Sequence, residues 1–130
     1  IVKATTANHK VELSNVLTGD EILFYQNLIR KIPVTDNVME YAVKLASKTR
    51  PNTEFSTEMV NKYLSWGAGP RASQYLIIGA KTHAAIKGKY SPDIEDVQAV
   101  AESILRHRIV RNYIAEAEGY TIERIIKELL

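Results

Sequence analysis

The stretch from Gly67 to Gly88 constrains the fold most, because it carries signals for both ends of one long helix. Pro70 suits the first helical position, where its missing N–H is not needed, and Gly88 suits the left-handed stop after the last turn. The residues on one side recur at helical spacing and predict the packed face: Ala72, Tyr75, Leu76, Gly79, Ala80, His83 and Ala84. The sequence therefore predicts a central helix for the domain.

Arg71 lies in the first turn of this helix, where the helix dipole disfavours a cation. An arginine beside unpaired backbone N–H groups is well placed to bind an anion. The alternative is a structural salt bridge, and the residues alone favour it.

Capping signals and apolar stripes predict helices before this one. Thr18 and Glu21 form a capping-box pattern that opens a helix from about Gly19 to Lys31, and Pro33 ends it. Its apolar side contains Ile22, Tyr25, Leu28, Ile29 and Ile32. Thr35 or Asp36 caps a second helix, about Asn37 to Lys48, with a stripe of Val38, Tyr41, Ala42, Leu45 and Ala46. Thr49 to Phe55 is expected to be a loop, because Pro51 disfavours helix at Arg50. Ser56 or Thr57 then caps a short helix through Leu64 or Ser65.

Two further helices are expected after Gly88. Ser91 as cap and Pro92 at the first position predict a helix to about Leu105. Its inward residues are Ile94, Val97, Ala101, Ile104 and Leu105. Thr121 caps a last helix whose buried side is Ile122, Ile125, Ile126 and Leu129. The segment 106–119 between them fits either a frayed continuation or a short strand and loop.

These elements predict an all-α fold, a small bundle of five to six helices with short connections. Residues 1–16 are expected to form an extended linker, with a short strand at Val11 to Leu13, and residues 17–130 the helical domain. The chain starts at Ile1 rather than Met, so we expect a piece of a longer protein.

Composition limits the classes of function. The 130 residues have a net charge of +2, too small by itself to indicate a nucleic-acid or membrane partner. There is no cysteine, which excludes disulfides and thiolate metal sites, and no apolar run long enough to span a bilayer. We expect a cytoplasmic protein.

The sequence has no phosphate-binding loop, no zinc-protease His pair, no nucleophile elbow and no calcium loop. The three histidines give no metal-ligand pattern, so no metal is expected. His83 is expected to be a half-buried packing residue and His107 a hydrogen-bonding surface group.

Two other groups have an alternative reading. Arg106, Arg108 and Arg111 form a basic cluster that suits phosphate groups, but a solvated helix end explains it better. Tyr63 and Trp66 precede Pro70 and are able to stack on a base, but aromatic residues in this position are more often core.

Three blocks of the sequence resemble the C-terminal helical lid of AAA+ ATPases of the MoxR family. The first is VTDNVMEYAVKLASKTRP, Val34 to Pro51. The second, Gly67 to Val97, begins GAGPRA and is similar to the family's Gly-Ala-Ser-Pro-Arg-Ala signature, with Gly69 in place of Ser. The third is ILRHRI, Ile104 to Ile109, with the helix Ala115 to Leu130. The likeness covers the chain from about Leu17, and the second block is the specific one.

The resemblance implies that Arg71 is the sensor-2 arginine, which reaches from the lid to the phosphates of ATP. It implies that Gly69, Pro70, Arg71 and Ala72 lie near the nucleotide, and that Gly67 and Gly69 let the backbone turn close to it. Mg²⁺ and the phosphate loop would belong to an upstream core domain, so the chain alone is not expected to hydrolyse ATP, whereas the full protein is.

The resemblance further implies a ring, usually a hexamer, in which each lid packs on a neighbouring subunit, and a chaperone-like task with an unknown client. Two alternatives stay open. One is a stand-alone all-α module that binds nucleic acid through Arg106 to Arg111. The other is a structural protein-interaction domain with an exposed apolar patch and no role for Arg71.

Overall fold

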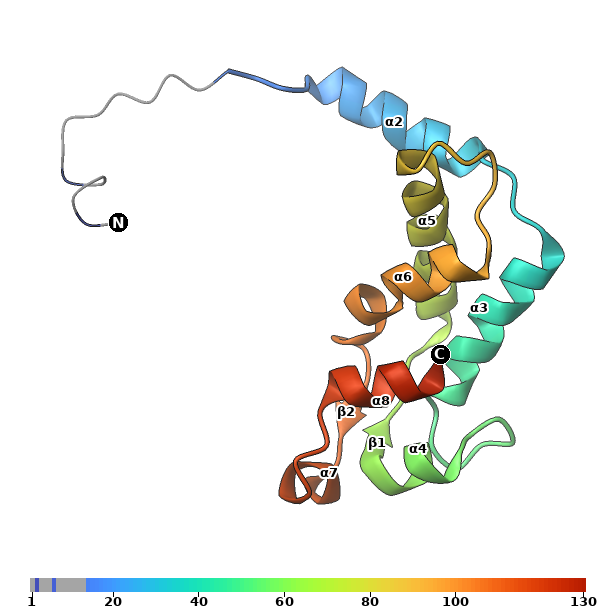
Figure 1. Cartoon of the computed structure of the whole chain (residues 1–130), viewed down its shortest axis with the longest axis vertical. Helices are drawn as coiled ribbons and strands as arrows, with labels where there is room; N and C mark the ends of the chain where they lie inside the picture. The colour runs from blue at the N-terminus through green and yellow to red at the C-terminus, as the bar shows by residue number, and fades with distance from the viewer. Residues whose placement is uncertain (1, 3–5, 7–13) are drawn as a thin grey trace.

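A computed structural model of the chain describes residues 2, 6 and 14–130, in which seven helices and one two-stranded sheet are found (Figure 1). The elements are α2 (Gly19–Lys31), α3 (Asp36–Lys48), α4 (Glu58–Tyr63), β1 (Leu64–Trp66), α5 (Pro70–Ile86), α6 (Ile94–Leu105), β2 (Val110–Arg111), α7 (Tyr113–Ala117) and α8 (Ile122–Leu129). The all-α prediction is confirmed. The helices outnumber the five or six expected because segment 106–119 contains both β2 and the short helix α7.

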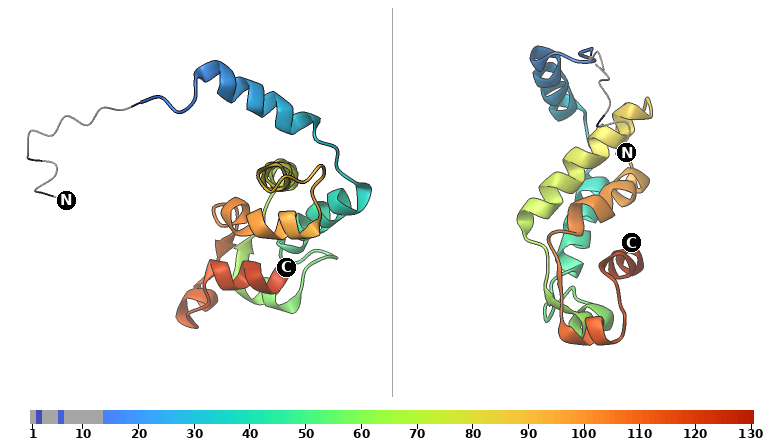
Figure 2. Two further views of the ribbon diagram at one scale, coloured as in Figure 1. Left: turned by 45° about the horizontal axis from the view of Figure 1, so that its top comes forward. Right: turned by 90° about the vertical axis from the view of Figure 1, so that its left-hand side faces the viewer.

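Helix α5 is the centre of the arrangement. Helices α3 and α6 pack against it, α2 lies across its C-terminal part, and α8 packs on α6 (Figure 1). The left view of Figure 2 looks nearly down α5, with α2 on one side and α6 on the other. At the other end of the molecule α4 contacts α7, and β1 pairs antiparallel with β2, with Trp66 opposite Val110.

The two ends of α5 are as predicted. Pro70 occupies its first turn, and Gly88 has a positive φ of 72°. The Lys89 N–H donates to the Ala84 carbonyl at 2.9 Å, which closes the last turn. The packed face also agrees, except that Tyr75 is half-exposed.

The predicted start of α6 is wrong. Asp93, not Ser91, is the N-cap, and Pro92 precedes the helix. The Asp93 carboxylate accepts from the Asp96 N–H at 3.1 Å, and the Asp96 carboxylate accepts from the Asp93 N–H at 2.9 Å. This reciprocal capping box satisfies two backbone donors, whereas a cap at Ser91 would satisfy one. The Ser91 hydroxyl instead donates to the Pro33 carbonyl.

The capping box of α2 is confirmed, because Glu21 accepts from the Thr18 N–H at 2.7 Å and Thr18 accepts from the Glu21 N–H. The stripes of α3 and α8 are buried, apart from partly buried Tyr41 and Ile122. Helix α2 differs, because it buries none of its residues.

One hydrophobic core joins α3, α4, α5, α6 and α8. Within the described residues only two buried side chains are polar, Thr49 and Asp96. The predicted strand at Val11 to Leu13 lies outside the described residues, as does most of the expected linker 1–16.

Candidate functional site

The loop Gly67–Gly69 leads into α5 and places Arg71 at the surface. Arg71 is exposed, and no carboxylate pairs with it in the described part of the chain. The structure therefore contradicts the salt-bridge alternative for this residue.

The start of α5 lacks the groups that usually neutralise a helix N-terminus. Its N-cap, Gly69, has no side chain to accept a hydrogen bond, and its first turn contains no acidic residue. The Arg71 N–H, the positive end of the helix dipole and the Arg71 guanidinium therefore lie together, whereas Pro70 has no N–H and the Ala72 N–H donates to the Gly69 carbonyl at 2.9 Å. Such an arrangement binds anions.

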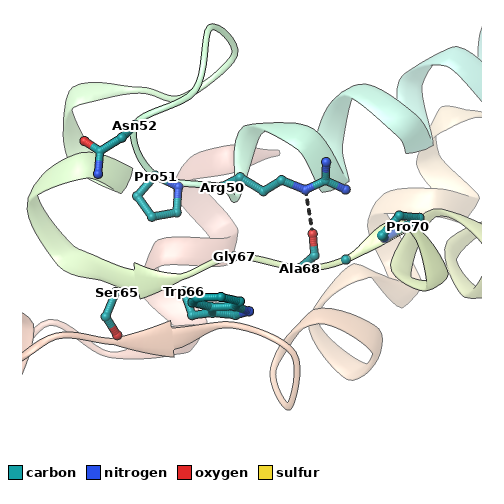
Figure 3. A pocket seen from close by; sticks show the side chains of 9 residues that line it. Arg50, Pro51, Asn52, Ser65, Trp66, Gly67, Ala68 and Pro70 are labelled. Atoms are coloured by element: carbon teal, nitrogen blue, oxygen red, sulfur yellow. Dashed lines mark hydrogen bonds between the residues drawn. The ribbon is translucent and has the colours of Figure 1, made fainter.

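Two consecutive residues at the end of α3 hold the loop in place. The Thr49 hydroxyl, fully buried, accepts from the Ala68 N–H at 2.8 Å and donates to the Ala46 carbonyl at 2.7 Å. Arg50 Nε donates to the Ala68 carbonyl at 2.9 Å, as Figure 3 shows. Both backbone groups of Ala68 are thus fixed, three residues before Arg71. We call these contacts the Ala68 clamp.

Gly67 is required by the clamp. A Cβ at this position would lie 2.4 Å from the Thr49 carbonyl oxygen and 2.5 Å from the Arg50 Cα, both backbone atoms that cannot move aside. Gly69, by contrast, has open space around it and an ordinary extended backbone. The serine usual at this place in MoxR-type sequences would fit here, so the Gly69 departure does not distort the turn.

A cavity of about 440 Å³ opens beside the loop, lined by Arg50, Pro51, Asn52, Ser65, Trp66, Gly67, Ala68, Gly69 and Pro70. The Trp66 ring lies alongside the Gly67–Ala68 segment (Figure 3). Trp66 is 71% exposed, so the expectation that it belongs to the core is wrong. Tyr63 does belong to the core, where its ring stacks on Tyr120 at 4.1 Å between centroids. Tyr63 is the last residue of α4, whereas Trp66 ends β1, beyond a register irregularity between Leu64 and Trp66.

Of the four residues predicted near a nucleotide, three lie together on the surface: Gly69, Pro70 and Arg71. The Ala72 side chain is fully buried in the core, so only its backbone is near the loop. The sequence reasoning missed Thr49 and Arg50. The consecutive Thr49 and Arg50 were visible in the sequence, but only a loop was predicted there and these two side chains were assigned no role.

At the C-terminal end of α5, a network of charged side chains has all its hydrogen-bond partners within the domain. The Asp96 carboxylate, 1% exposed, accepts from His83 Nδ1 at 2.7 Å and Lys89 Nζ at 3.0 Å as well as from the Asp93 N–H. Burial raises the pKa of the Asp96 carboxyl, but the hydrogen bonds from Asp93, His83 and Lys89 together lower it by more, so its pKa lies well below the ordinary value. His83 is half-buried as predicted, and it joins α5 to α6.

The three arginines of the basic cluster contact other residues of the same domain. Arg106 pairs with Glu123 at 3.2 Å, and Arg111 donates to the Tyr120 carbonyl at 2.7 Å. Arg108 donates to the Ile104 carbonyl, contacts His107 and lies over the Tyr75 ring. All three arginines therefore have partners within the domain, whereas a solvated helix end was expected, and Arg111 lies in β2. No group of metal-ligating side chains is found among residues 2, 6 and 14–130, and within them no helix is long and apolar enough to cross a membrane.

Comparison with known protein families matches residues 56–129 to the AAA lid domain. The chain is 28% identical over 119 residues to the chaperone MoxR1 of Mycobacterium tuberculosis, covering 92% of this chain and 32% of that protein. It is 26% identical over 124 residues to the uncharacterized protein YeaC of Bacillus subtilis, covering 95% of this chain and 36% of that protein. The chain thus spans about a third of the length of these relatives.

A solved structure from Cytophaga hutchinsonii, titled a "putative ATPase", has the same fold. It superimposes with a TM-score of 0.84 at 30% identity and covers 98% of this chain and 39% of that one. The similarity therefore extends beyond residues 56–129 to include most of α2 and α3.

Proposed function

Since the chain belongs to the AAA lid domain family, we propose that it closes over ATP held by an upstream core domain and supplies Arg71 as the sensor-2 residue. The observation that carries this proposal is the exposed, unpaired guanidinium at the uncapped start of α5. In a lid that had only to fold, a cation in this position would be unfavourable.

The residues present fit a nucleoside triphosphate. The γ-phosphate is an anion with several acceptor oxygens, and a planar guanidinium donates to two of them at once. The Arg71 guanidinium and the Arg71 N–H would hold the phosphates, with Gly69 and Pro70 beside them. ATP itself supplies the transferable phosphoryl group, and Mg²⁺ would be held by the core domain.

The lid's contribution to hydrolysis is positioning and charge stabilisation, which dominate catalysis of phosphoryl transfer. Arg71 neutralises negative charge on the phosphates when the lid is closed, and the Ala68 clamp fixes where that charge lies. The chain alone would bind ATP weakly and would not hydrolyse it, because Arg71 and the start of α5 are only one side of such a site, and the phosphate loop and the Mg²⁺ ligands would belong to the core domain.

The family relationship supports an oligomeric assembly. We propose a ring of the full protein, a hexamer by analogy, in which the lid contacts its own core and a neighbouring subunit. The relative MoxR1 is named a chaperone, and we propose a chaperone-like role in maturing a client protein, in the cytoplasm.

The nucleic-acid alternative has less support, because Arg106, Arg108 and Arg111 all have partners within the domain. The interaction-domain alternative predicts no effect of Arg71 on ATP turnover.

The test is the ATPase rate of the full-length protein carrying Arg71→Ala. We expect kcat to fall roughly 10–1,000-fold, by analogy with other arginines that contact transferred phosphates. Arg71→Lys should recover only part of the rate, because an ammonium cannot donate in the bidentate manner.

The matched control is Arg106→Ala, which removes an exposed arginine paired with Glu123 and should leave kcat within about twofold. Equal rates for the Arg71→Ala protein and this control would remove Arg71 from the proposed mechanism.

A further inference from the structure

We infer that the outer face of α2 is the surface through which this domain docks on the ATPase core of its own chain. The inference rests on the proposed function, which supplies that core. It concerns a different part of the molecule from Arg71.

Helix α2 has a wide apolar face, and within the described residues none of its side chains is buried. Ile22, Tyr25 and Ile29 lie on the side toward α5, and Phe24 and Leu28, one turn apart, continue the apolar face outward. Phe24 is 62% exposed and Leu28 45%. Even on the inner side the fit is open, because a cavity of about 530 Å³ separates α2 from Tyr75, Ile78 and Thr82 of α5.

The sequence of α2 nevertheless contains strong helix signals at both ends. It has a complete capping box, acidic residues in its first turn and Arg30 and Lys31 in its last. A helix of 13 residues is marginal in water unless its apolar side is packed. Among the described helices of eight residues or more, α2 alone buries no residue. The pattern is that of a helix whose packing partner lies in another domain.

The comparisons indicate which domain that is. The AAA lid match covers residues 56–129 and leaves out both α2 and α3; of these two helices, α3 packs in the core and α2 buries no residue. The Cytophaga structure nevertheless matches 98% of this chain while being more than twice its length. Helix α2 is therefore kept in a protein that has a large additional part available to cover it.

Sequence order favours the core of the same chain over that of a neighbour. In the proposed arrangement the core precedes α2, which is the first helix of the domain, and consecutive elements usually pack together. The views in Figure 1 and the right-hand part of Figure 2 show α2 projecting beyond the body of the domain, where a preceding domain has access to it.

The experiment is hydrogen exchange of the α2 amides in the full-length protein and in this 130-residue chain. We expect α2 to exchange at least about tenfold more slowly in the full-length protein, because docking suppresses its local opening. Phe24→Gln together with Leu28→Gln should return exchange in the full-length protein to the rate of the isolated chain. Both side chains are exposed in this domain, so the double variant should leave its unfolding midpoint unchanged.

The matched control is Arg30→Gln, an exposed position on the side of α2 turned away from Phe24 and Leu28, which should keep the protection. Equal α2 exchange in the two proteins would overturn the inference. Protection that depends on protein concentration, in either protein, would overturn it in favour of a second copy of the chain as the occupant.

The outcomes separate this inference from the proposed role of Arg71. If Arg71→Ala leaves ATP turnover unchanged while α2 is protected, the sensor-2 proposal fails and docking stands. If Arg71→Ala lowers turnover while α2 is unprotected, docking fails and the sensor-2 proposal stands.

Discussion

The two ends of α5 differ in whether the charged side chain beside them has partners within the domain. At its C-terminal end a buried anion, Asp96, has hydrogen bonds from His83, Lys89 and the Asp93 backbone. At its N-terminal end an exposed cation, Arg71, has no partner in the described structure and lies where the helix dipole opposes it. A charge whose partners are complete within the domain stabilises that domain, whereas a charge without partners is available to a ligand. The comparison therefore separates residues that stabilise the lid from the residue for which we propose a role in ATP turnover.

The largest effect on stability is expected at the buried anion. Asp96→Asn removes the charge that His83 and Lys89 contact, and should lower the free energy of unfolding by about 2–4 kcal/mol at pH 7. Urea denaturation of the 130-residue chain measures it. Asp93→Asn is the control, since Asn caps helices as well as Asp does, and should cost less than about 1 kcal/mol. Equal losses in the two variants would mean that the buried charge adds nothing.

The same carboxylate predicts how stability depends on pH. The pKa of Asp96 is lowered on folding, so its contribution is complete above the pKa it has when unfolded, about 3.9, and declines as the pH falls below that value. The stability difference between the unmutated chain and Asp96→Asn should therefore be constant from pH 7 to pH 5 and shrink toward pH 3. A difference that stays constant down to pH 3 would contradict the low pKa.

A smaller loss is expected at the Ala68 clamp, which belongs to the Arg71 end. Thr49→Val keeps the volume but leaves the Ala68 N–H without an acceptor, and should cost about 1–3 kcal/mol of unfolding free energy. Thr49→Ser keeps the hydroxyl and is the matched control. In the full-length protein, the valine variant should also lower ATP turnover at temperatures where it is folded. Turnover equal to that of the serine variant would show that the clamp serves folding alone.

The smallest expected effect is an increase, rather than a decrease, in the free energy of unfolding. Arg71→Ala removes an unpaired cation from the start of α5 and should raise the unfolding free energy of the 130-residue chain by up to about 0.5 kcal/mol. Thermal and urea unfolding beside the unmutated chain test this. A loss of more than 1 kcal/mol would show that Arg71 has a structural role after all, and would remove the contrast between the two ends.

The elements were predictable from sequence where local signals decide them. The caps at Thr18 and Thr121 and the ends of α5 at Pro70 and Gly88 were predicted correctly, because each depends on residues within one turn, and Thr57 was one of two predicted caps for α4. The start of α6 was not, since Ser91 and Asp93 both lie close to Pro92 and both suit a cap. The reciprocal bond from Asp96 decided between them.

The candidate site was predictable only in part. Arg71 stood out because of its place in the first turn, but its lack of a partner is a property of the whole fold. The Ala68 clamp joins residues 18 and 19 positions apart, which no local pattern reveals. Periodicity also predicted an apolar side for α2, but it did not indicate that α2 would bury none of its residues.

The length of α5 has a mechanical consequence. Its 17 residues form a rod about 25 Å long, held at one end by Thr49 and Arg50 and contacted near the other by α2. A tilt of about 10° around the held end would displace the far end by roughly 4 Å, since a helix transmits rotation along its whole length. In the proposed mechanism, phosphate binding near the held end would tilt α5, and the resulting displacement would be largest at the far end, near α2.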